Sequence, residues 1–179
     1  MKKLLTAALA TLMTVAPSMA KSNHSDHQRL FNEVKRAGVS VYINPTKGCD
    51  PRYNGGRKVF GFYAGRIQTM VICQETALRT GQFDTQHDWT EEDYDTLRHE
   101  AHHLVQDCRD SSLDSQLQAV YREPLTLAKN TLSTRKIEWI LKSYGEQGDH
   151  MVVMELEAFS VAQLNDPLEQ VQEIRTYCM

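Results

Sequence analysis

The sequence predicts an α+β fold in which a small antiparallel β-sheet or hairpin is followed by a helical region. Segments rich in β-branched and aromatic residues, separated by turn residues, lie in the first half of the chain. From residue 90 onward, apolar residues recur at helical spacing. Strands that come first and helices that come later are typical of an α+β protein.

The first half of the chain is predicted to hold one helix and three strands. Residues 21–29 are polar and are expected to fray, and the helix that follows can end at Gly38. Strands are predicted at Val39–Asn44, Lys58–Gly65 and Arg66–Glu75, and the last two form a hairpin around Ala64-Gly65-Arg66. Pro45–Gly56 is dense in Pro, Gly, Asn and Asp and is predicted to be a loop.

The second half is predicted to be helical. Thr90 can cap a helix with Asp93 three residues later, and Trp89 and Tyr94 are placed to form a hydrophobic staple. That helix should run to about Cys108. Further helices are predicted at Ser112–Tyr121, Ser133–Tyr144 and Asp149–Leu164, with a last one that begins at Asp166-Pro167.

The N-terminus has the pattern of a bacterial secretory signal. Lys2 and Lys3 precede the apolar run Leu4–Ala16, and Ser18 and Ala20 are small residues at the −3 and −1 positions of a cleavage site. We expect cleavage after Ala20, which leaves residues 21–179 as one domain in the periplasm or outside the cell. An uncleaved membrane anchor is the alternative, although the run is short for a bilayer span.

All four cysteines follow the predicted signal. An even number of cysteines in an exported chain favours two disulfides. We favour Cys49–Cys73, which would tie a loop to the hairpin, and Cys108–Cys178, which would hold the C-terminus against the preceding long helix. Free buried thiols are the alternative.

The charge balance argues against some partners. Removal of Lys2 and Lys3 changes the formal net charge from −3 to −5, because residues 1–20 contain no acid. A mildly acidic chain without a basic cluster is not typical of proteins that bind nucleic acid or anionic membranes. The sequence does not specify an oligomeric state.

The stretch HEAHH carries the strongest chemical signal. His99 and His103 are four residues apart, so on a helix their side chains lie on one face and can bind one ion. Glu100 would then act on a metal-bound water, which is the chemistry of the HEXXH motif of zinc hydrolases. His102 points elsewhere and has no expected ligand role. A solvated polar helix face would have the same pattern, so the motif needs a third ligand.

The helix predicted at Asp149–Leu164 offers that ligand. Its apolar residues point all round it, which indicates burial, yet Glu155 and Glu157 are embedded among them. A buried carboxylate costs several kcal/mol unless it meets a cation or strong hydrogen-bond donors. A Zn²⁺ ion held by two histidines is one such partner. Alternatively, the glutamates reach solvent or pair with Arg or Lys.

Over Lys58–Leu164 the sequence resembles the gluzincin branch of the zincin metallopeptidases, through HEAHH and the later E-x-E-A of Glu155–Ala158. The resemblance implies a hairpin before the HEXXH helix whose edge strand, here Arg66–Cys73, lies along the substrate cleft. It also implies a glutamate as third zinc ligand, with alanine either three residues later or directly after it.

Glu155 matches the first of these forms and Glu157 the second. We prefer Glu155, because Ala158 and Ala162 lie near its face and would let two helices approach closely. The sequence departs from the family pattern four positions after the ligand, where Phe159 or Val161 replaces an acidic or amide residue.

The resemblance also implies a Tyr or His that stabilises the oxyanion. Tyr144 and His150 are the nearest candidates, and each could instead be structural. Gln106 and Asp107 are candidates to hydrogen-bond the metal ligands.

Together these features predict an exported zinc metallopeptidase. His99, His103 and Glu155 would bind Zn²⁺, and Glu100 would act as general base. The substrate would be a peptide or protein, with a cell-wall amide as the alternative. A non-catalytic zinc-binding or disulfide-stapled binding protein on a zincin-like scaffold is the second hypothesis. Glu100 separates the two, because a structural zinc site does not require it.

Overall fold

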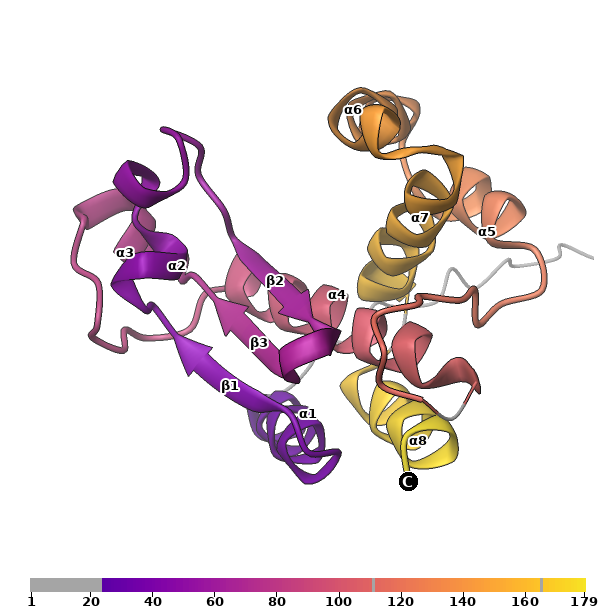
Figure 1. Cartoon of the computed structure of the whole chain (residues 1–179), viewed down its shortest axis with the longest axis horizontal. Helices are drawn as coiled ribbons and strands as arrows, with labels where there is room; N and C mark the ends of the chain where they lie inside the picture. The colour runs from indigo at the N-terminus through magenta and orange to yellow at the C-terminus, as the bar shows by residue number, and fades with distance from the viewer. Residues whose placement is uncertain (1–23, 111, 165) are drawn as a thin grey trace, which may run out of the picture.

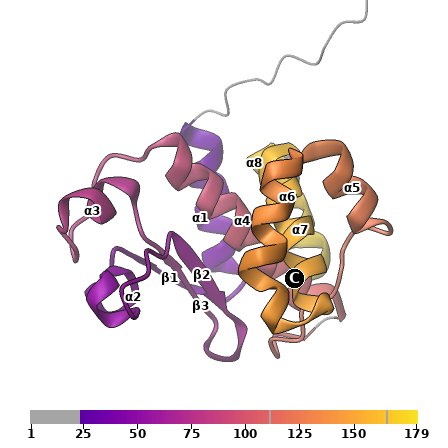
Figure 2. The same cartoon turned by 90° about the horizontal axis from the view of Figure 1, so that it is seen from above.

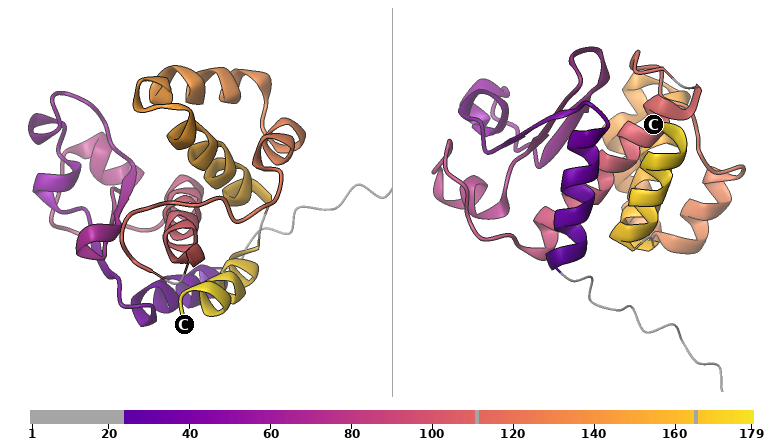
Figure 3. Two further views of the ribbon diagram at one scale, coloured as in Figure 1. Left: turned by 45° about the vertical axis from the view of Figure 1, so that its right-hand side comes forward. Right: turned by 90° about the horizontal axis from the view of Figure 1, so that it is seen from below.

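A long helix, α4 (Glu91–Asp107), lies at the centre of the computed structural model (Figure 1). It contacts strand β2 (Gly61–Ala64), helix α7 (Asp149–Leu164), helix α8 (Pro167–Tyr177) and helix α1 (His24–Arg36). Seen from above, the sheet and α7 lie on opposite sides of α4 (Figure 2). Helices α1 and α8 lie next to each other, beneath α4 in the left view of Figure 3 and in front of it in the right view, which is seen from below.

The structure describes residues 24–110, 112–164 and 166–179. The predicted signal segment, residues 1–20, lies outside these residues. Among them, no helix combines the length and the hydropathy that crossing a bilayer requires. A small sheet and a larger set of helices make up the fold, so the predicted α+β class is confirmed.

The sheet is mixed rather than antiparallel. In the described residues it has the strand order β1-β3-β2, with β1 at Ser40–Ile43 and β3 at Thr69–Ile72. Strand β3 pairs antiparallel with β2, which confirms the hairpin, and parallel with β1. Side-chain alternation does not encode strand direction, so the sequence could not reveal the parallel pair. Because β3 is central, Arg66–Cys73 is not the edge strand that we expected, and β2 takes that place.

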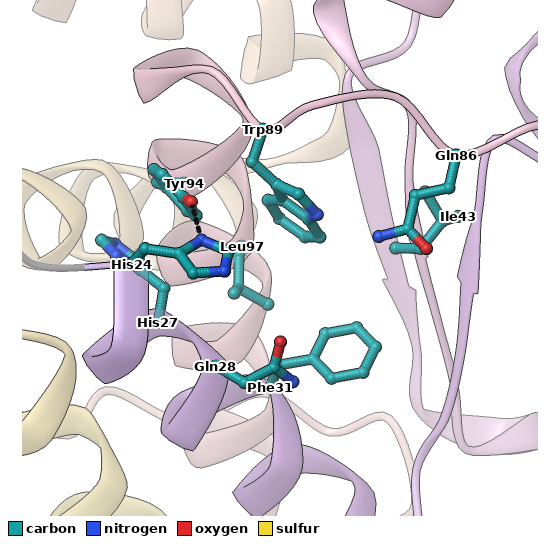
Figure 4. Close-up of a pocket in the computed structure, with 9 residues that line it drawn as sticks. All are labelled: His24, His27, Gln28, Phe31, Ile43, Gln86, Trp89, Tyr94 and Leu97. Carbon is teal, nitrogen blue, oxygen red and sulfur yellow. Dashed lines mark hydrogen bonds between the residues drawn. The ribbon is translucent and has the colours of Figure 1, made fainter.

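The start of α4 is held by aromatic contacts with α1. Thr90 and Asp93 form the predicted capping box. The rings of Trp89 and Tyr94 stack with centroids 5.5 Å apart, and His27 of α1 stacks on Tyr94 at 4.0 Å. The Tyr94 hydroxyl also hydrogen-bonds Nδ1 of His24 (Figure 4). These contacts order residues 24–29 as helix, where we predicted fraying, and they line a cavity of about 200 Å³.

The segment predicted as loop at residues 45–56 contains two short helices, α2 (Thr46–Cys49) and η1 (Pro51–Tyr53). Asp50 caps η1 by accepting a hydrogen bond from the Arg52 backbone amide. A further short helix, α3 (Glu75–Thr80), follows β3.

The helices after α4 differ from the prediction at one place. Helices α6 (Thr134–Tyr144), α7 and α8 are found close to their predicted positions. Ser112–Tyr121 contains no helical residue, and α5 (Pro124–Thr131) follows it instead. Buried side chains of α4 and α7 accept hydrogen bonds from the backbone amides of Ser115, Val120 and Tyr121, which replace part of the hydrogen bonding that a helix would provide.

Both favoured disulfides are present. Cys49–Cys73 joins α2 to the end of β3, and Cys108–Cys178 joins the end of α4 to the end of α8. A main core lies between the sheet, α1, α4 and α8, and a second cluster lies between α5, α6 and α7.

The two disulfides should contribute unequally to stability. Their sequence separations are 70 residues for Cys108–Cys178 and 24 for Cys49–Cys73. The loop-entropy relation then gives about 4 kcal/mol for the longer loop and roughly 1 kcal/mol less for the shorter one. Urea unfolding should therefore show a larger decrease in the free energy of unfolding for the Cys108→Ala/Cys178→Ala variant than for Cys49→Ala/Cys73→Ala. The reverse order would show that local packing, rather than loop length, sets the contribution.

Candidate metal centre

His99 and His103 converge on one side of α4. Their Nε2 atoms are 3.1 Å apart, and both side chains are buried rather than solvated. The two histidines therefore do not belong to a solvated polar face, which the sequence also allowed. His102 points away from the pair, as predicted.

Glu155 of α7 meets these two imidazoles. Its Oε2 lies 3.3 Å from Nε2 of His99, and its Oε1 lies 3.5 Å from Nε2 of His103. Ala158 and Ala162 are buried in the same helix, and their small side chains are compatible with the close approach of α7 to α4. The long-range contact on which the metal hypothesis depends is thus formed by Glu155.

The separations among these donor atoms fit a tetrahedral zinc ion. Zn–N and Zn–O bonds of about 2.0–2.1 Å place tetrahedral ligand atoms about 3.3 Å apart. The two Nε2 atoms, 3.1 Å apart, are close to that value, and each faces a different oxygen of Glu155, at 3.3 Å for His99 and 3.5 Å for His103. Among the described residues, His99, His103 and Glu155 are grouped with donor atoms within 4.8 Å of one another. Two imidazoles and one carboxylate leave the fourth position of a catalytic zinc site open.

The ionisable groups of the cluster shift one another's pKa values. Burial lowers the pKa of His99 to about 4. Burial also opposes the charged form of His103, but the carboxylates of Glu155 and Glu100 outweigh it and raise the pKa of His103 to about 9. Burial would raise the pKa of Glu155, yet contacts with His103 and His99 hold it far below its ordinary value. Glu155 is therefore a carboxylate that requires a positive partner.

The side chain of Glu100 extends from α4 toward the edge strand β2. Burial raises the pKa of Glu100 to about 7, partly opposed by His103 and by a backbone hydrogen bond from Tyr63. Strand β2 approaches closely here, because a Cβ on Gly61 would lie 2.7 Å from Thr96 Cγ2 and 3.1 Å from Glu100 Cγ. A carboxylate with a pKa near neutrality can both accept and donate a proton.

A cleft of about 340 Å³ opens over this cluster. The backbone of β2 forms one wall, and Tyr144 with Met151 lies on the wall toward α7. Burial is the largest cause that raises the pKa of Tyr144, and the carboxylates of Glu155 and Glu100 raise it further. His150 is not among the residues that line the cleft, and its Nε2 lies 2.8 Å from the carbonyl oxygen of Leu117. Of the two oxyanion candidates, only Tyr144 faces the cluster.

Gln106 holds the second histidine. Nδ1 of His103 lies 2.7 Å from Oε1 of Gln106, and the Gln106 amide donates to the Met154 carbonyl at 3.0 Å and to Glu157 at 2.8 Å. Because both amide hydrogens point into fixed acceptors, Oε1 faces His103 as an acceptor. Nδ1 then carries the proton and Nε2 is free to bind a metal.

Glu157 occupies a separate buried site. It accepts the backbone amides of Val120 at 3.2 Å and Tyr121 at 2.7 Å, beside Nε2 of His102 at 3.3 Å. Burial opposes its charge, but His102, Gln106 and the Tyr121 amide lower its pKa. The alternative ligand Glu157 therefore faces the loop after α4, whereas Glu155 faces the histidines.

Asp107 does not contact a ligand but connects two walls of the cleft. Its Oδ2 accepts the hydroxyl of Tyr63 from β2 at 2.7 Å, and its Oδ1 accepts the backbone amide of Ser115 at 2.6 Å. The close packing leaves no room beside Gly65, where a Cβ would lie 2.2 Å from Asp107 Oδ2.

Phe159 packs against the first histidine. Its ring centroid is 4.2 Å from that of His99, and Nδ1 of His99 has no hydrogen-bond partner among the residues that the structure describes. This position is where the gluzincin pattern has a polar residue, so His99 is oriented by an aromatic ring. This role of Phe159 was not predicted from the sequence. The position of Phe159, four residues after Glu155, was the feature that could have indicated it.

Residues 18–179 match the family described as Domain of unknown function (DUF8637). The chain belongs to this family. Neither the curated proteins nor the solved structures gave a match. The description of the DUF8637 family states no activity, so the function of this member has to be argued from its own side chains.

Replacement of Gln106 should weaken metal binding in this DUF8637 chain. Gln106→Leu removes the acceptor at His103 Nδ1, and loss of such a contact typically lowers metal affinity about 10- to 100-fold. Gln74→Leu is the matched control, because Gln74 is also buried and its side chain hydrogen-bonds Asn44 and the His87 backbone, away from the cluster. Competition with a zinc chelator measures both affinities. Equal affinities for the two variants would remove Gln106 from this role.

Proposed function

We propose that this chain is an exported zinc-dependent metallopeptidase that hydrolyses peptide bonds. The observation that carries the proposal is the buried meeting of His99, His103 and Glu155 beside the carboxylate of Glu100 in an open cleft. A purely structural site has no use for a buried, near-neutral carboxylate at its open side.

Each residue of the cluster has a defined role in this proposal. His99, His103 and Glu155 would hold the zinc, which when bound supplies a Lewis acid that acidifies water and polarises a carbonyl group. Glu100 accepts the proton of the attacking water and returns it to the leaving amine. The Tyr144 hydroxyl stays protonated because its pKa is raised, so it can donate a hydrogen bond to the developing oxyanion.

The surrounding fold supports a zincin-like scaffold. A hairpin precedes the HEXXH helix, and its edge strand β2 lines the cleft. The glutamate that meets the histidines comes from a later helix and is followed three positions on by Ala158. Two disulfides agree with an oxidising compartment, which supports export.

Glu100→Gln should separate metal binding from hydrolysis. The variant keeps all three ligands, so the purified protein should carry about one zinc, while hydrolysis of a broad peptide library should fall roughly 100- to 10,000-fold. Glu92→Gln is the control, because Glu92 is an exposed acid on the same helix. Zinc content by atomic emission and peptide cleavage by mass spectrometry provide the two readouts.

Zinc-loaded wild-type protein that cleaves no peptide in the library would contradict the peptidase proposal. It would favour a non-catalytic metal-binding protein instead. Loss of zinc in Glu100→Gln would contradict the assignment of Glu100 as a base.

A further inference from the structure

Residues 45–60 form a distinct surface feature, named here the basic lobe. It contains α2 and η1 and is tied to the sheet by Cys49–Cys73. The Asn54 side chain donates to the Gly48 carbonyl at 2.8 Å, and the Cys73 amide donates to the Phe60 carbonyl at 2.7 Å. In Figures 1 and 2 the α2 end of the lobe lies on the side of the sheet away from α5, α6 and α7. The lobe is therefore an ordered platform.

Charge is concentrated on this lobe. It holds four of the 20 Lys and Arg residues of the chain but one of its 23 Asp and Glu residues. That acid, Asp50, is buried and bound by Arg52. Lys47, Arg57 and Lys58 are exposed and form no ion pair among the described residues. The expectation that the chain lacks a basic cluster overlooked these four cations, which lie within twelve residues of one another in the sequence.

Exposed aromatic side chains accompany the cations. Tyr53 is 62 % exposed and Phe60 is 43 % exposed, and Phe62 on the adjoining strand is 37 % exposed. Exposed aromatic and cationic side chains together are typical of surfaces that bind another molecule. Asp84, the acid that hydrogen-bonds Thr46, lies at the α2 side of the lobe.

The lobe runs directly into the cleft. Gly61 and Phe62 line the cleft and follow the last residue of the lobe. Lys58 is three residues before Gly61, so their Cα atoms lie within about 11 Å. Gly61 in turn abuts Glu100. A chain bound along β2 would therefore pass from the catalytic carboxylate to the cations within a few residues.

We propose that the basic lobe binds an acidic segment of a polypeptide substrate whose scissile bond lies in the cleft. The inference rests on the proposed peptidase function and names its substrate class. The cations of the lobe precede Gly61, which abuts Glu100, by three or more residues, so acidic residues are favoured several positions from the scissile bond rather than beside it. Contacts between exposed charges are screened by salt, so the preference should fall as ionic strength rises.

Binding of labelled peptides to the zinc-loaded Glu100→Gln variant tests the inference without cleavage. The probes are fluorescein-labelled Glu-Glu-Glu-Glu-Ala-Phe-Leu-Ala-Ala, Ala-Ala-Phe-Leu-Ala-Glu-Glu-Glu-Glu, and the same two peptides with lysine for every glutamate. Fluorescence anisotropy in 50 mM salt should show at least one acidic peptide binding at least tenfold more tightly than its lysine counterpart. The difference should shrink severalfold in 0.5 M salt.

Charge-reversal variants test whether the basic lobe causes the preference for acidic peptides. Added to the same Glu100→Gln background, Arg57→Glu/Lys58→Glu should abolish it. Lys129→Glu/Lys142→Glu should retain it, because that pair changes the net charge equally at exposed positions on α5 and α6. Equal binding of acidic and lysine peptides, or equal loss in both double variants, would overturn the inference. So would lobe-dependent binding to phosphatidylglycerol vesicles without any acidic-peptide preference.

Failure of the basic-lobe proposal can be distinguished from failure of the proposed peptidase function. Wild-type cleavage of neutral and acidic peptides at equal rates would leave the peptidase intact and overturn the lobe as a substrate site. Lobe-dependent binding of acidic peptides without cleavage by the wild-type protein would support the surface and contradict the peptidase.

Discussion

The contact between Glu155 and the two histidines of α4 constrains the rest of the structure. A carboxylate buried between helices is tolerated only with a positive partner, and here the partner is a protonated imidazole or a bound cation. The small side chains of Ala158 and Ala162 are compatible with the close approach of α7 to α4. The sheet, the disulfides and the aromatic contacts at the start of α4 then keep this helix in place relative to α7, so that three donor atoms remain within reach of one another.

A second layer of buried polar groups extends from this contact. Gln106 joins His103 to Glu157, and Glu157 binds the backbone of the segment after α4. Asp107 joins the same segment to β2. The ligand geometry and the two walls of the cleft therefore depend on shared hydrogen bonds. A change in the loop at residues 112–121 should therefore alter the positions of the two histidines, because few buried polar groups in this layer are free to adjust.

The sequence predicts the features that depend on local spacing. His99 and His103 are placed on one face by helical periodicity, the capping box follows from Thr90 and Asp93, and burial of Glu155 follows from the apolar residues around it. Features that depend on distant partners were missed. Strand direction in the sheet, the non-helical backbone of Ser112–Tyr121 and the contact of Phe159 with His99 all arise from residues far apart in the chain. The basic lobe is a different case, because its cations lie in one contiguous segment that could have been recognised from the sequence.

The proposed metal centre is tested most directly by crystals of the mature protein grown with zinc. Diffraction data collected on either side of the zinc absorption edge locate the ion without reference to activity. The account predicts one anomalous peak, about 2 Å from Nε2 of His99, Nε2 of His103 and one oxygen of Glu155. A strong peak elsewhere, with none between these three side chains at full zinc loading, would contradict it.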